Sequence, residues 1–233
     1  MNNKKIVFFT GAGISAESGI STFRDTGGLW EQYKIEDICT AGCLDANRDE
    51  TVEFYNKRRD DIKDKIPNKA HETIAKLQKK YPKNIKIITQ NVDDLFEKAG
   101  CTDILHLHGF LPEVRCQDDY CEYIANIGYE AQDVECPLCG GYLRPNIVFF
   151  GEQAPKYQDM YEELQNVDMI IIIGTSGNVI NVQYLIDGAK YSVLNNLEYS
   201  DAIDDNLFDK VIYDKATVAI DEIEVLVEEL IEE

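Results

Sequence analysis

The chain has 233 residues, an apolar fraction of 44% and a formal net charge of −20, with 43 acidic and 23 basic side chains. This length can bury a sizeable core within one domain, and the apolar fraction is typical of a globular rather than a disordered chain. The negative charge disfavours binding to nucleic acid phosphates; it favours solubility or basic, lysine-bearing partners.

Targeting segments are not expected. The apolar run after the first five residues is too short for a secretory signal. The longest aliphatic run, residues 169–173, is far below the ~20 residues that a membrane span needs. We therefore expect a cytoplasmic protein without a membrane partner, whose seven cysteines do not form a disulfide framework.

The first motif is a glycine turn after the apolar run 6–9. Gly11, Gly13 and Ala16 fit the spacing G-x-G-x-x-G/A, which lets backbone N–H groups approach a pyrophosphate. Alone this is a weak signal. The helical pattern that follows is brief, and a Gly-rich loop with the only tryptophan, Trp30, interrupts it. An ordinary dehydrogenase would instead continue to a second strand that ends in an acid.

A helix is predicted over residues 48–66, because Pro67 should end it. Tyr55 and Arg58 lie three apart and share a face of this helix. Together they could hold a carboxylate, with the guanidinium as a bidentate donor. Spacing alone favours the simpler alternative, an exposed arginine beside a half-buried tyrosine.

The next helix is predicted over residues 69–80, and we interpret its His71 as a surface or hydrogen-bonded residue without a role. Strand 84–89 then leads into the polar stretch Gln90, Asn91, Val92 and Asp93. Side chains at the carboxyl end of a strand lie where open α/β sheets bind ligands, and amides there can orient a ribose or carboxamide. Asn91 or Asp93 could also cap the following helix, and both roles are compatible.

A short strand that begins at Ile104 ends in His108 and Gly109. Histidine is the side chain suited to taking a proton near neutral pH. A lone histidine is more often structural, and in a regular strand His106 shares a face with His108. The residues alone therefore leave both histidines open as the candidate base.

Two close cysteine pairs follow, with fourteen residues between them: Cys116 with Cys121, and Cys136 with Cys139. Such pairs predict a tetrahedral zinc site, and four thiolates leave no open coordination position, so the ion should be structural. Cys39, Cys43 and Cys101 lie outside this set and are expected to be small buried residues.

The remaining pattern alternates strands and helices. We expect a strand that resumes at 144, a helix over 157–165, and strand 168–173, which is apolar on both faces and belongs in a buried parallel sheet. That strand ends in a second polar glycine loop, 174–178. A helix over 181–190, strands 192–194 and 210–213 and an acidic helix from residue 216 complete the chain.

This alternation predicts an α/β fold with a Rossmann-like doubly wound parallel sheet. We expect a single domain over residues 1–233, with a helical insertion at about 31–68 and a smaller zinc-binding insertion at about 113–144.

Taken together, the motifs resemble those of the sirtuin family of NAD-dependent protein lysine deacylases over essentially the full chain. The matching stretches occur in the family's order, which makes the match far more specific than any one motif: residues 11–24, 90–93, 108–109, the four cysteines, 150–152, 174–176 and 196–198. The resemblance implies NAD as co-substrate, one structural zinc ion, release of nicotinamide and transfer of the acyl group from lysine to ADP-ribose.

The resemblance also assigns residues by position. It implies that NAD contacts Gly11, Ala12, Gly13, Ser15, Glu17, Phe23, Arg24, Trp30, Gln90, Asn91, Val92, Asp93, Gly174, Thr175, Ser176, Asn196, Leu197, Glu198 and Ala216. It makes His108, which precedes Gly109, the general base and gives Asn91 a catalytic part. Val148, Phe150 and Gly151 would line the acyl-lysine channel.

Residues 53–59 resemble the segment of bacterial class III sirtuins in which a tyrosine and an arginine recognise acidic acyl groups. This implies that Tyr55 and Arg58 bind a succinyl or malonyl carboxylate. Cys39 stands where that class usually has alanine, and it is small enough to keep the pocket open. Asn181 replaces the family's usual proline, and four residues rather than two separate the first cysteine pair.

Acyl-lysine side chains of proteins are the expected partners of what should be a monomer. Within the family, a protein ADP-ribosyltransferase or an NAD glycohydrolase is the alternative. A Rossmann dehydrogenase is disfavoured by the missing acidic second strand. A non-enzymatic NAD sensor or zinc-ribbon adaptor is disfavoured by the presence of both the 90–93 stretch and His108.

Overall fold

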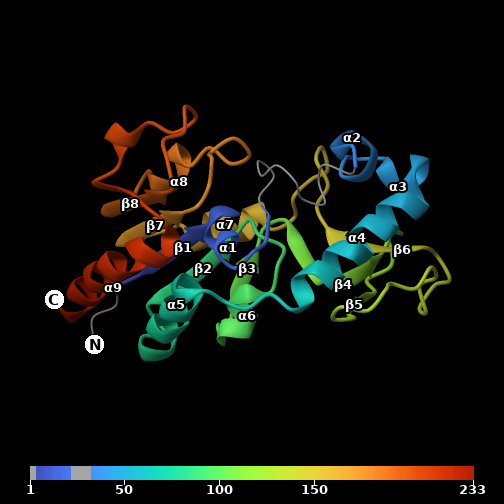
Figure 1. Ribbon diagram of the computed structural model, residues 1–233, viewed down its shortest axis with the longest axis horizontal. Coiled ribbons are helices and arrows are strands. Elements are labelled where there is room, and N and C mark those ends of the chain that lie inside the picture. The colour runs from blue at the N-terminus through green and yellow to red at the C-terminus, as the bar shows by residue number, and fades with distance from the viewer. Residues whose placement is uncertain (1–3, 22–32) are drawn as a thin grey trace.

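The computed structural model describes residues 4–21 and 33–233 (Figure 1). Its centre is a six-stranded sheet with the strand order β3-β2-β1-β7-β8-β9, in which all neighbours run parallel. The strands are β1 (Ile6–Thr10), β2 (Ile85–Thr89), β3 (Ile104–His106), β7 (Met169–Ile173), β8 (Tyr191–Asn196) and β9 (Lys210–Tyr213). The chain winds outward from β1 to β3 and then returns to the other side of β1, so the predicted doubly wound α/β sheet is confirmed.

Both faces of this sheet are covered, which is why its central strands are apolar throughout. Ile6 and Phe8 of β1 point to one face and Val7 and Phe9 to the other, and all four are fully buried. The first face packs against α5 (Lys69–Lys80), α6 (Leu95–Ala99) and α9 (Ala216–Glu232), and the second against α7 (Tyr157–Glu163) and α8 (Gln183–Ile186).

A smaller module lies beside the large sheet, to the right in Figure 1. It contains a three-stranded antiparallel sheet of β5 (Ile124–Asn126), β4 (Gly109–Cys116) and β6 (Leu143–Ile147), and the helices α2 (Ile35–Ile38), α3 (Cys43–Ala46) and α4 (Arg48–Lys63). β4 and β5 are not among the predicted strands. The sequence of β4 contains Pro112 and its pairing with β6 shifts register, so it lacks a regular alternation of apolar residues.

A fully buried arginine fastens α4 to this small sheet. Arg59 Nε donates to the carbonyl of Leu111 on β4 at 2.9 Å, and Nη1 donates to Asn56 Oδ1 at 2.7 Å. Nη2 reaches Gln132 Oε1 at 3.4 Å. Burial lowers the pKa of Arg59 to about 10, but these acceptors satisfy its donors. The face of α4 that carries Tyr55 and Arg58 is thereby held against the small module.

Helix α5 is tied to the glycine turn by the side chain before it. Asn68 Oδ1 accepts from the N–H of Ala70, an N-cap contact, and Asn68 Nδ2 donates to the carbonyl of Ile14 at 2.7 Å. The turn that follows β1 is therefore anchored from the helix side as well as from the sheet.

Helix ends differ from the predictions at three places, the first being α7, which ends at Glu163 rather than at residue 165. α4 ends at Lys63, three residues before the expected boundary, and α8 covers only Gln183–Ile186 of the expected 181–190. Residue 187 is extended and Gly188 has a positive φ of 91°, which ends the helix after one turn. α5 has the predicted bounds.

Within the two described ranges, 4–21 and 33–233, no helix combines the length and apolar character needed to cross a membrane.

Candidate active site

The glycine turn after β1 packs directly on the loop after β7. The N–H of Gly13 donates to the carbonyl of Gly174 at 2.8 Å, and a Cβ on Gly13 would lie only 2.6 Å from Gly174 Cα. Gly174 itself has a φ of +69°. No side chain fits at this contact, which lies between β1 and β7, where the strand order reverses. Gly11 and the half-buried Ala12 belong to the same turn, at the edge where doubly wound sheets bind ligands.

Ser15, Asn91 and Asp93 form a hydrogen-bonded chain beside that turn. Asn91 Nδ2 donates to Ser15 Oγ at 3.0 Å, and Ser15 Oγ donates to Asp93 Oδ2 at 2.9 Å. Burial raises the pKa of Asp93, against the hydrogen bonds from Leu95 N–H and Ser15. Asp93 Oδ1 accepts from the N–H of Leu95, the first residue of α6, but the N-cap position is Asp94, which makes no side-chain cap hydrogen bond.

A second set of contacts joins the loops that follow β2, β7 and β8. Gln90 Nε2 donates to Thr175 Oγ1 at 3.1 Å, and Asn196 Nδ2 donates to the carbonyl of Thr175 at 2.9 Å. The neighbouring Ser176 accepts through its carbonyl from Ser200 Oγ. The structure therefore brings the predicted amides and the second glycine loop together at one edge of the sheet.

The outer members of the predicted cofactor set are more dispersed. Glu17 is exposed, and its carboxylate accepts from the N–H and the hydroxyl of Thr217 at 3.1 and 2.8 Å. A carboxylate at the start of α9 is stabilised by the helix dipole. Ala216 is buried at the start of this helix, whereas Leu197 and Glu198 are exposed beyond β8.

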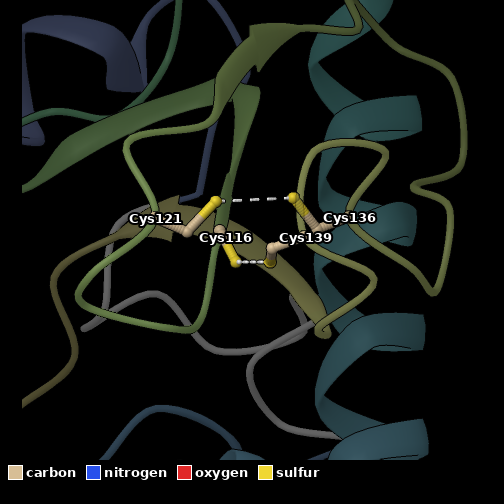
Figure 2. Close-up of side chains that lie close together, drawn as sticks. All are labelled: Cys116, Cys121, Cys136 and Cys139. Atoms are coloured by element: carbon tan, nitrogen blue, oxygen red, sulfur yellow. Dashed lines mark hydrogen bonds between the residues drawn. The ribbon is translucent and has the colours of Figure 1, made fainter.

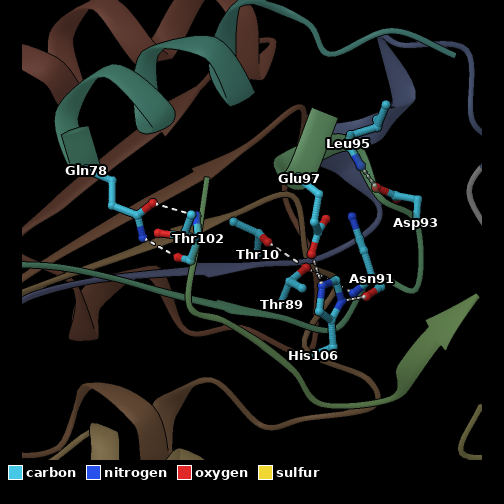
Figure 3. Close-up of polar contacts among 9 residues, drawn as sticks. All are labelled: Thr10, Gln78, Thr89, Asn91, Asp93, Leu95, Glu97, Thr102 and His106. Atoms are coloured by element: carbon cyan, nitrogen blue, oxygen red, sulfur yellow. Dashed lines mark hydrogen bonds and ion pairs between the residues drawn. The ribbon is translucent and has the colours of Figure 1, made fainter. Parts of the chain in front are cut away.

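The two candidate histidines have different partners. His106, the last residue of β3, lies between Asn91 and Glu97 (Figure 3): Nδ1 is 3.0 Å from the Asn91 carbonyl and Nε2 is 2.8 Å from Glu97 Oε1. Burial acts to lower the pKa of His106, but the contact with Glu97 raises it overall. Nδ1 thus contacts the loop that carries Asn91, and Nε2 contacts α6.

His108 lies just beyond the end of β3. Its Nδ1 is 3.1 Å from the carbonyl of Gln90 and its Nε2 is 3.1 Å from the hydroxyl of Tyr157. Burial lowers the pKa of His108, with the Gln90 carbonyl acting against that shift. The next residue must be glycine, because Gly109 has a φ of +92° and a Cβ there would lie 2.0 Å from the Asn146 carbonyl oxygen.

Tyr55 and Arg58 are both buried on α4, so the exposed-arginine alternative is wrong. The hydroxyl of Tyr55 lies 3.0 Å from Cys39 Sγ, and its ring stacks on Phe149 at 5.5 Å between centroids. Burial lowers the pKa of Arg58, while Asp61, Asp93, Tyr55 and Cys39 act against the shift. Nη1 of Arg58 forms an ion pair with Asp61 Oδ2 at 3.4 Å, and weaker electrostatic interactions link the guanidinium to Asp93, Tyr55 and Cys39.

The predicted channel residues follow β6. The N–H of Val148 donates to the His108 carbonyl at 2.9 Å, which places this strand end beside the candidate base. Phe150 exchanges backbone hydrogen bonds with residues 39 and 41, and Phe150 and Gly151 are exposed. The segment therefore runs between His108 and the start of the small helical layer.

An ion pair that was not predicted holds this segment in place. Buried Arg144 donates through Nη1 and Nη2 to the two carboxylate oxygens of Glu152 at 2.7 and 2.9 Å, and Glu152 Oε2 also accepts from the N–H of Phe149. Burial alone would raise the pKa of Glu152, but the guanidinium holds it below its ordinary value. A bidentate pair of this kind fixes geometry.

The four cysteine sulfurs converge between two loops of the small module (Figure 2). They lie within 4.8 Å of one another, with Cys116 and Cys139 Sγ at 3.5 Å and Cys121 and Cys136 Sγ at 3.8 Å. Thiolates around a tetrahedral zinc ion, at about 2.3 Å each, stand roughly 3.8 Å apart. The donor set fits one structural zinc ion, and the longer first loop closes on the cluster.

A family model described as the Sir2 family matches residues 11–181. An NAD-dependent protein deacylase of Campylobacter jejuni subsp. jejuni is 47% identical over 222 residues, which is 94% of each chain. The chain belongs to the Sir2 family. Another NAD-dependent protein deacylase, from Helicobacter hepaticus, is 42% identical over 246 residues, covering 94% of this chain and 96% of that one.

The fold of this Sir2 family member agrees with solved structures. A Sir2 homologue in complex with NAD aligns with a TM-score of 0.85 at 33% identity, covering 98% of this chain and 91% of the other. The resemblance to sirtuins drawn from the motifs is therefore confirmed. Phe23, Arg24 and Trp30, which the resemblance assigns to the cofactor, lie outside the described residues.

Sequence reasoning missed two residues at the site of this Sir2 family chain. Tyr157 contacts the candidate base from α7, and Arg144 anchors the channel segment. Neither belongs to a recognisable spacing. A basic residue six positions before the 150–152 stretch was the only signal for Arg144, and Tyr157 had none.

Proposed function

We propose that this protein is an NAD-dependent protein lysine deacylase, which transfers an acyl group from lysine to ADP-ribose and releases nicotinamide. The observation that carries the proposal is the convergence of the Gly13–Gly174 contact, the chain of Ser15, Asn91 and Asp93, and His108 at one edge of the sheet. The deacylase names of the two bacterial relatives support it.

The residues at this edge fit a dinucleotide. Gly13 and Gly174 let the two loops pack backbone to backbone, at the sheet edge where doubly wound folds bind a dinucleotide. Asn196, whose amide donates to the Thr175 carbonyl, would lie at the adenosine half, and Gln90, whose amide donates to the Thr175 hydroxyl, would hold the nicotinamide ribose. NAD would supply the ribose carbon that receives the acyl oxygen and the nicotinamide that leaves.

His108 is proposed as the general base, and its contacts suit that role. A backbone carbonyl only accepts hydrogen bonds, so the contact with Gln90 places the ring proton on Nδ1. Nε2 then carries the lone pair that can take a proton. A lowered pKa keeps the imidazole neutral at physiological pH. His106 is proposed to hold the Asn91 loop instead, because both of its nitrogens are already engaged.

An acidic acyl group is the proposed preferred substrate. Tyr55 and Arg58 would bind the distal carboxylate of a succinyl or malonyl group, since both are buried on one face of α4 and a guanidinium can donate two parallel hydrogen bonds to a carboxylate. Val148, Phe150 and Gly151 would line the path of the lysine side chain. Phe150 and Gly151 are exposed, so the residues on either side of the acyl-lysine could lie against this segment as an extended strand.

We also propose a cellular compartment, a class of partner and an oligomeric state for the protein. All seven cysteines are free, which favours a reducing compartment such as the cytoplasm. The net charge of −20 would attract lysine-rich protein segments rather than nucleic acid. We propose one catalytic domain, working as a monomer, whose helical insertion (31–68) and zinc-binding insertion (113–144) form one wall of the site.

Mass spectrometry tests the proposal. The protein is incubated with NAD and peptides that carry acetyl-, malonyl- or succinyl-lysine. The expected products are the unmodified peptide, nicotinamide and O-acyl-ADP-ribose. His108→Ala should abolish deacylation while keeping the wild-type circular dichroism spectrum and zinc content. ADP-ribosylated protein would contradict the deacylase proposal in favour of a transferase. Nicotinamide release without loss of the acyl group would favour a glycohydrolase.

A further inference from the structure

The proposed base has a side-chain partner that belongs to none of the predicted motifs. The hydroxyl of Tyr157 lies 3.1 Å from Nε2 of His108, and the two rings are tilted by 45° with centroids 6.2 Å apart. This is an edge contact through the hydroxyl rather than a ring stack. The nitrogen involved is the one that would take a proton.

The direction of this hydrogen bond follows from the other side of the ring. Nδ1 faces the carbonyl of Gln90, which cannot donate, so Nδ1 carries the proton of the neutral imidazole. Nε2 therefore has a lone pair and no proton. The phenol of Tyr157 is the donor and Nε2 is the acceptor.

The fold holds Tyr157 in this position. It is the first residue of α7, and its ring packs half-buried against the apolar cluster on the second face of the sheet. The segment before it carries the proposed channel residues Val148, Phe150 and Gly151, and Val148 is bonded to the carbonyl of His108 itself. The same stretch of chain therefore contacts both the backbone and the ring of His108.

We propose that Tyr157 is a positioning residue for His108: its hydroxyl fixes the imidazole in the neutral Nδ1–H form and occupies Nε2 until a substrate hydroxyl replaces it. The inference rests on the proposed function, in which His108 is the base. A pyridine-type nitrogen has one in-plane lone pair, so a ribose hydroxyl and the phenol cannot both bond to it fully. Binding of the substrate must displace Tyr157.

The hydrogen bond from Tyr157 also affects the pKa of His108. A hydrogen bond donated to the neutral form of a histidine disfavours the charged form, so the contact should lower the pKa of His108 beyond the effect of burial. Of the titratable side chains that the structure describes, Tyr157 from α7 contacts the His108 ring, whereas the nitrogens of His106 on β3 face Asn91 and Glu97. Tyr161 lies further along α7 and acts on Tyr157 rather than on His108.

Histidine NMR of the protein without NAD tests the contact directly. The chain has only three histidines, and His106→Gln and His108→Gln variants assign their ring signals. In Tyr157→Phe the pKa of His108 should rise by about half a pH unit or more, because one hydrogen bond to the neutral form is lost. Tyr161→Phe, an exposed tyrosine of the same helix, should leave it unchanged. Equal His108 titrations in wild type and Tyr157→Phe would overturn the proposal.

The pH dependence of catalysis distinguishes the role of Tyr157 from the role of His108 as the base. The acidic limb of the pH profile of kcat/KM for NAD should move to higher pH in Tyr157→Phe by the same amount as the NMR titration. A shifted NMR titration with an unmoved limb would mean that His108 is not the base. That result would overturn the catalytic part of this proposal together with the assigned role of His108. The phenylalanine ring keeps the packing of α7, so loss of folding does not confuse the comparison.

Discussion

The sulfur of Cys39 lies 3.0 Å from the hydroxyl oxygen of Tyr55. Burial raises the pKa of Cys39 to about 11, with the Tyr55 hydrogen bond acting against it, and burial also raises the pKa of Tyr55 well above its ordinary value. Both groups are therefore neutral near pH 7. The thiol and the phenol satisfy each other in the apolar cluster that joins α4 to the small sheet.

Cys39→Ala should change acyl specificity through this contact. Without the thiol, the phenol of Tyr55 is free to donate to a substrate carboxylate, and the pocket gains a little room. We expect kcat/KM for a succinyl-lysine peptide to rise about two- to five-fold, the effect of one modest hydrogen bond, with little change for acetyl-lysine. Cys43→Ala, which removes another buried thiol of the same cluster, is the control. Equal changes for both substrates would contradict this role of Cys39.

Arg58→Met should show the charge requirement of the pocket. We expect kcat/KM for succinyl-lysine to fall about ten- to hundred-fold, because a bidentate, charge-assisted contact is lost, and that for acetyl-lysine to fall far less. Competition between the two peptides in one reaction measures the ratio. Lys57→Met on the exposed face of α4 should leave the ratio unchanged. A parallel loss for both acyl groups would show that Arg58 serves the fold rather than the substrate.

His71 should make the protein sensitive to acid. It is fully buried on α5 against Phe96, with ring centroids 4.9 Å apart, and neither ring nitrogen has a hydrogen-bond partner among the described residues. Burial lowers its pKa to about 4. Between the unfolded value of about 6.5 and this folded value, only the unfolded chain binds the proton. The free energy of unfolding should therefore fall as the pH drops from 6.5 to 4, by up to about 1.4 kcal/mol per pH unit.

Urea unfolding at pH 7 and pH 5 checks the role of His71. His71→Leu should lose less stability than wild type between these two values, since leucine cannot take up a proton. Ile74→Leu, a buried substitution on the same helix, should keep the wild-type dependence. If His71→Leu and wild type lose the same free energy, the acid sensitivity comes from other groups.

Zinc removal should unfold the small module first. The ligand loops contribute two sulfurs each, and beyond those sulfurs they share a buried cluster with Val114 and Leu143. Cys136→Ser should reduce the bound zinc from about one ion per chain to well below that, and lower the midpoint of thermal unfolding. Atomic emission and differential scanning fluorimetry measure both. Cys101→Ala should retain its zinc, and a full complement of zinc in Cys136→Ser would refute the ligand set.

The wrong sequence interpretations share one cause. His71 was interpreted as surface or hydrogen-bonded and is neither, because its burial depends on Phe96 and the large sheet rather than on its own helix. The bounds of α8 were overestimated because a local pattern does not show where the chain must turn. β4 escaped prediction since its partner β6 lies beyond the cysteine loops, far along the chain. Contacts distant in sequence leave no local signal.

The sequence by itself determined the features that depend on neighbouring residues. Apolar runs and their helical or alternating periods set the strands and helices of the large sheet. The glycine spacing set the turn after β1, and the two cysteine pairs set a metal site, because each needs only a few positions along the chain. The ordered motifs, from the glycine turn to the 196–198 stretch, were enough to indicate the family.

The tertiary structure decided how chemically similar residues differ. His106 and His108 follow the same strand pattern, but their contacts differ: Glu97 contacts Nε2 of His106, and the hydroxyl of Tyr157 contacts Nε2 of His108. Arg58 and Arg59 are adjacent on α4, but only the contacts of Arg59, which donates to the carbonyl of Leu111, assign it to holding the small sheet. Each partner arrives from an element that the chain reaches only by folding, so burial and hydrogen bonding, not residue type, assign these side chains.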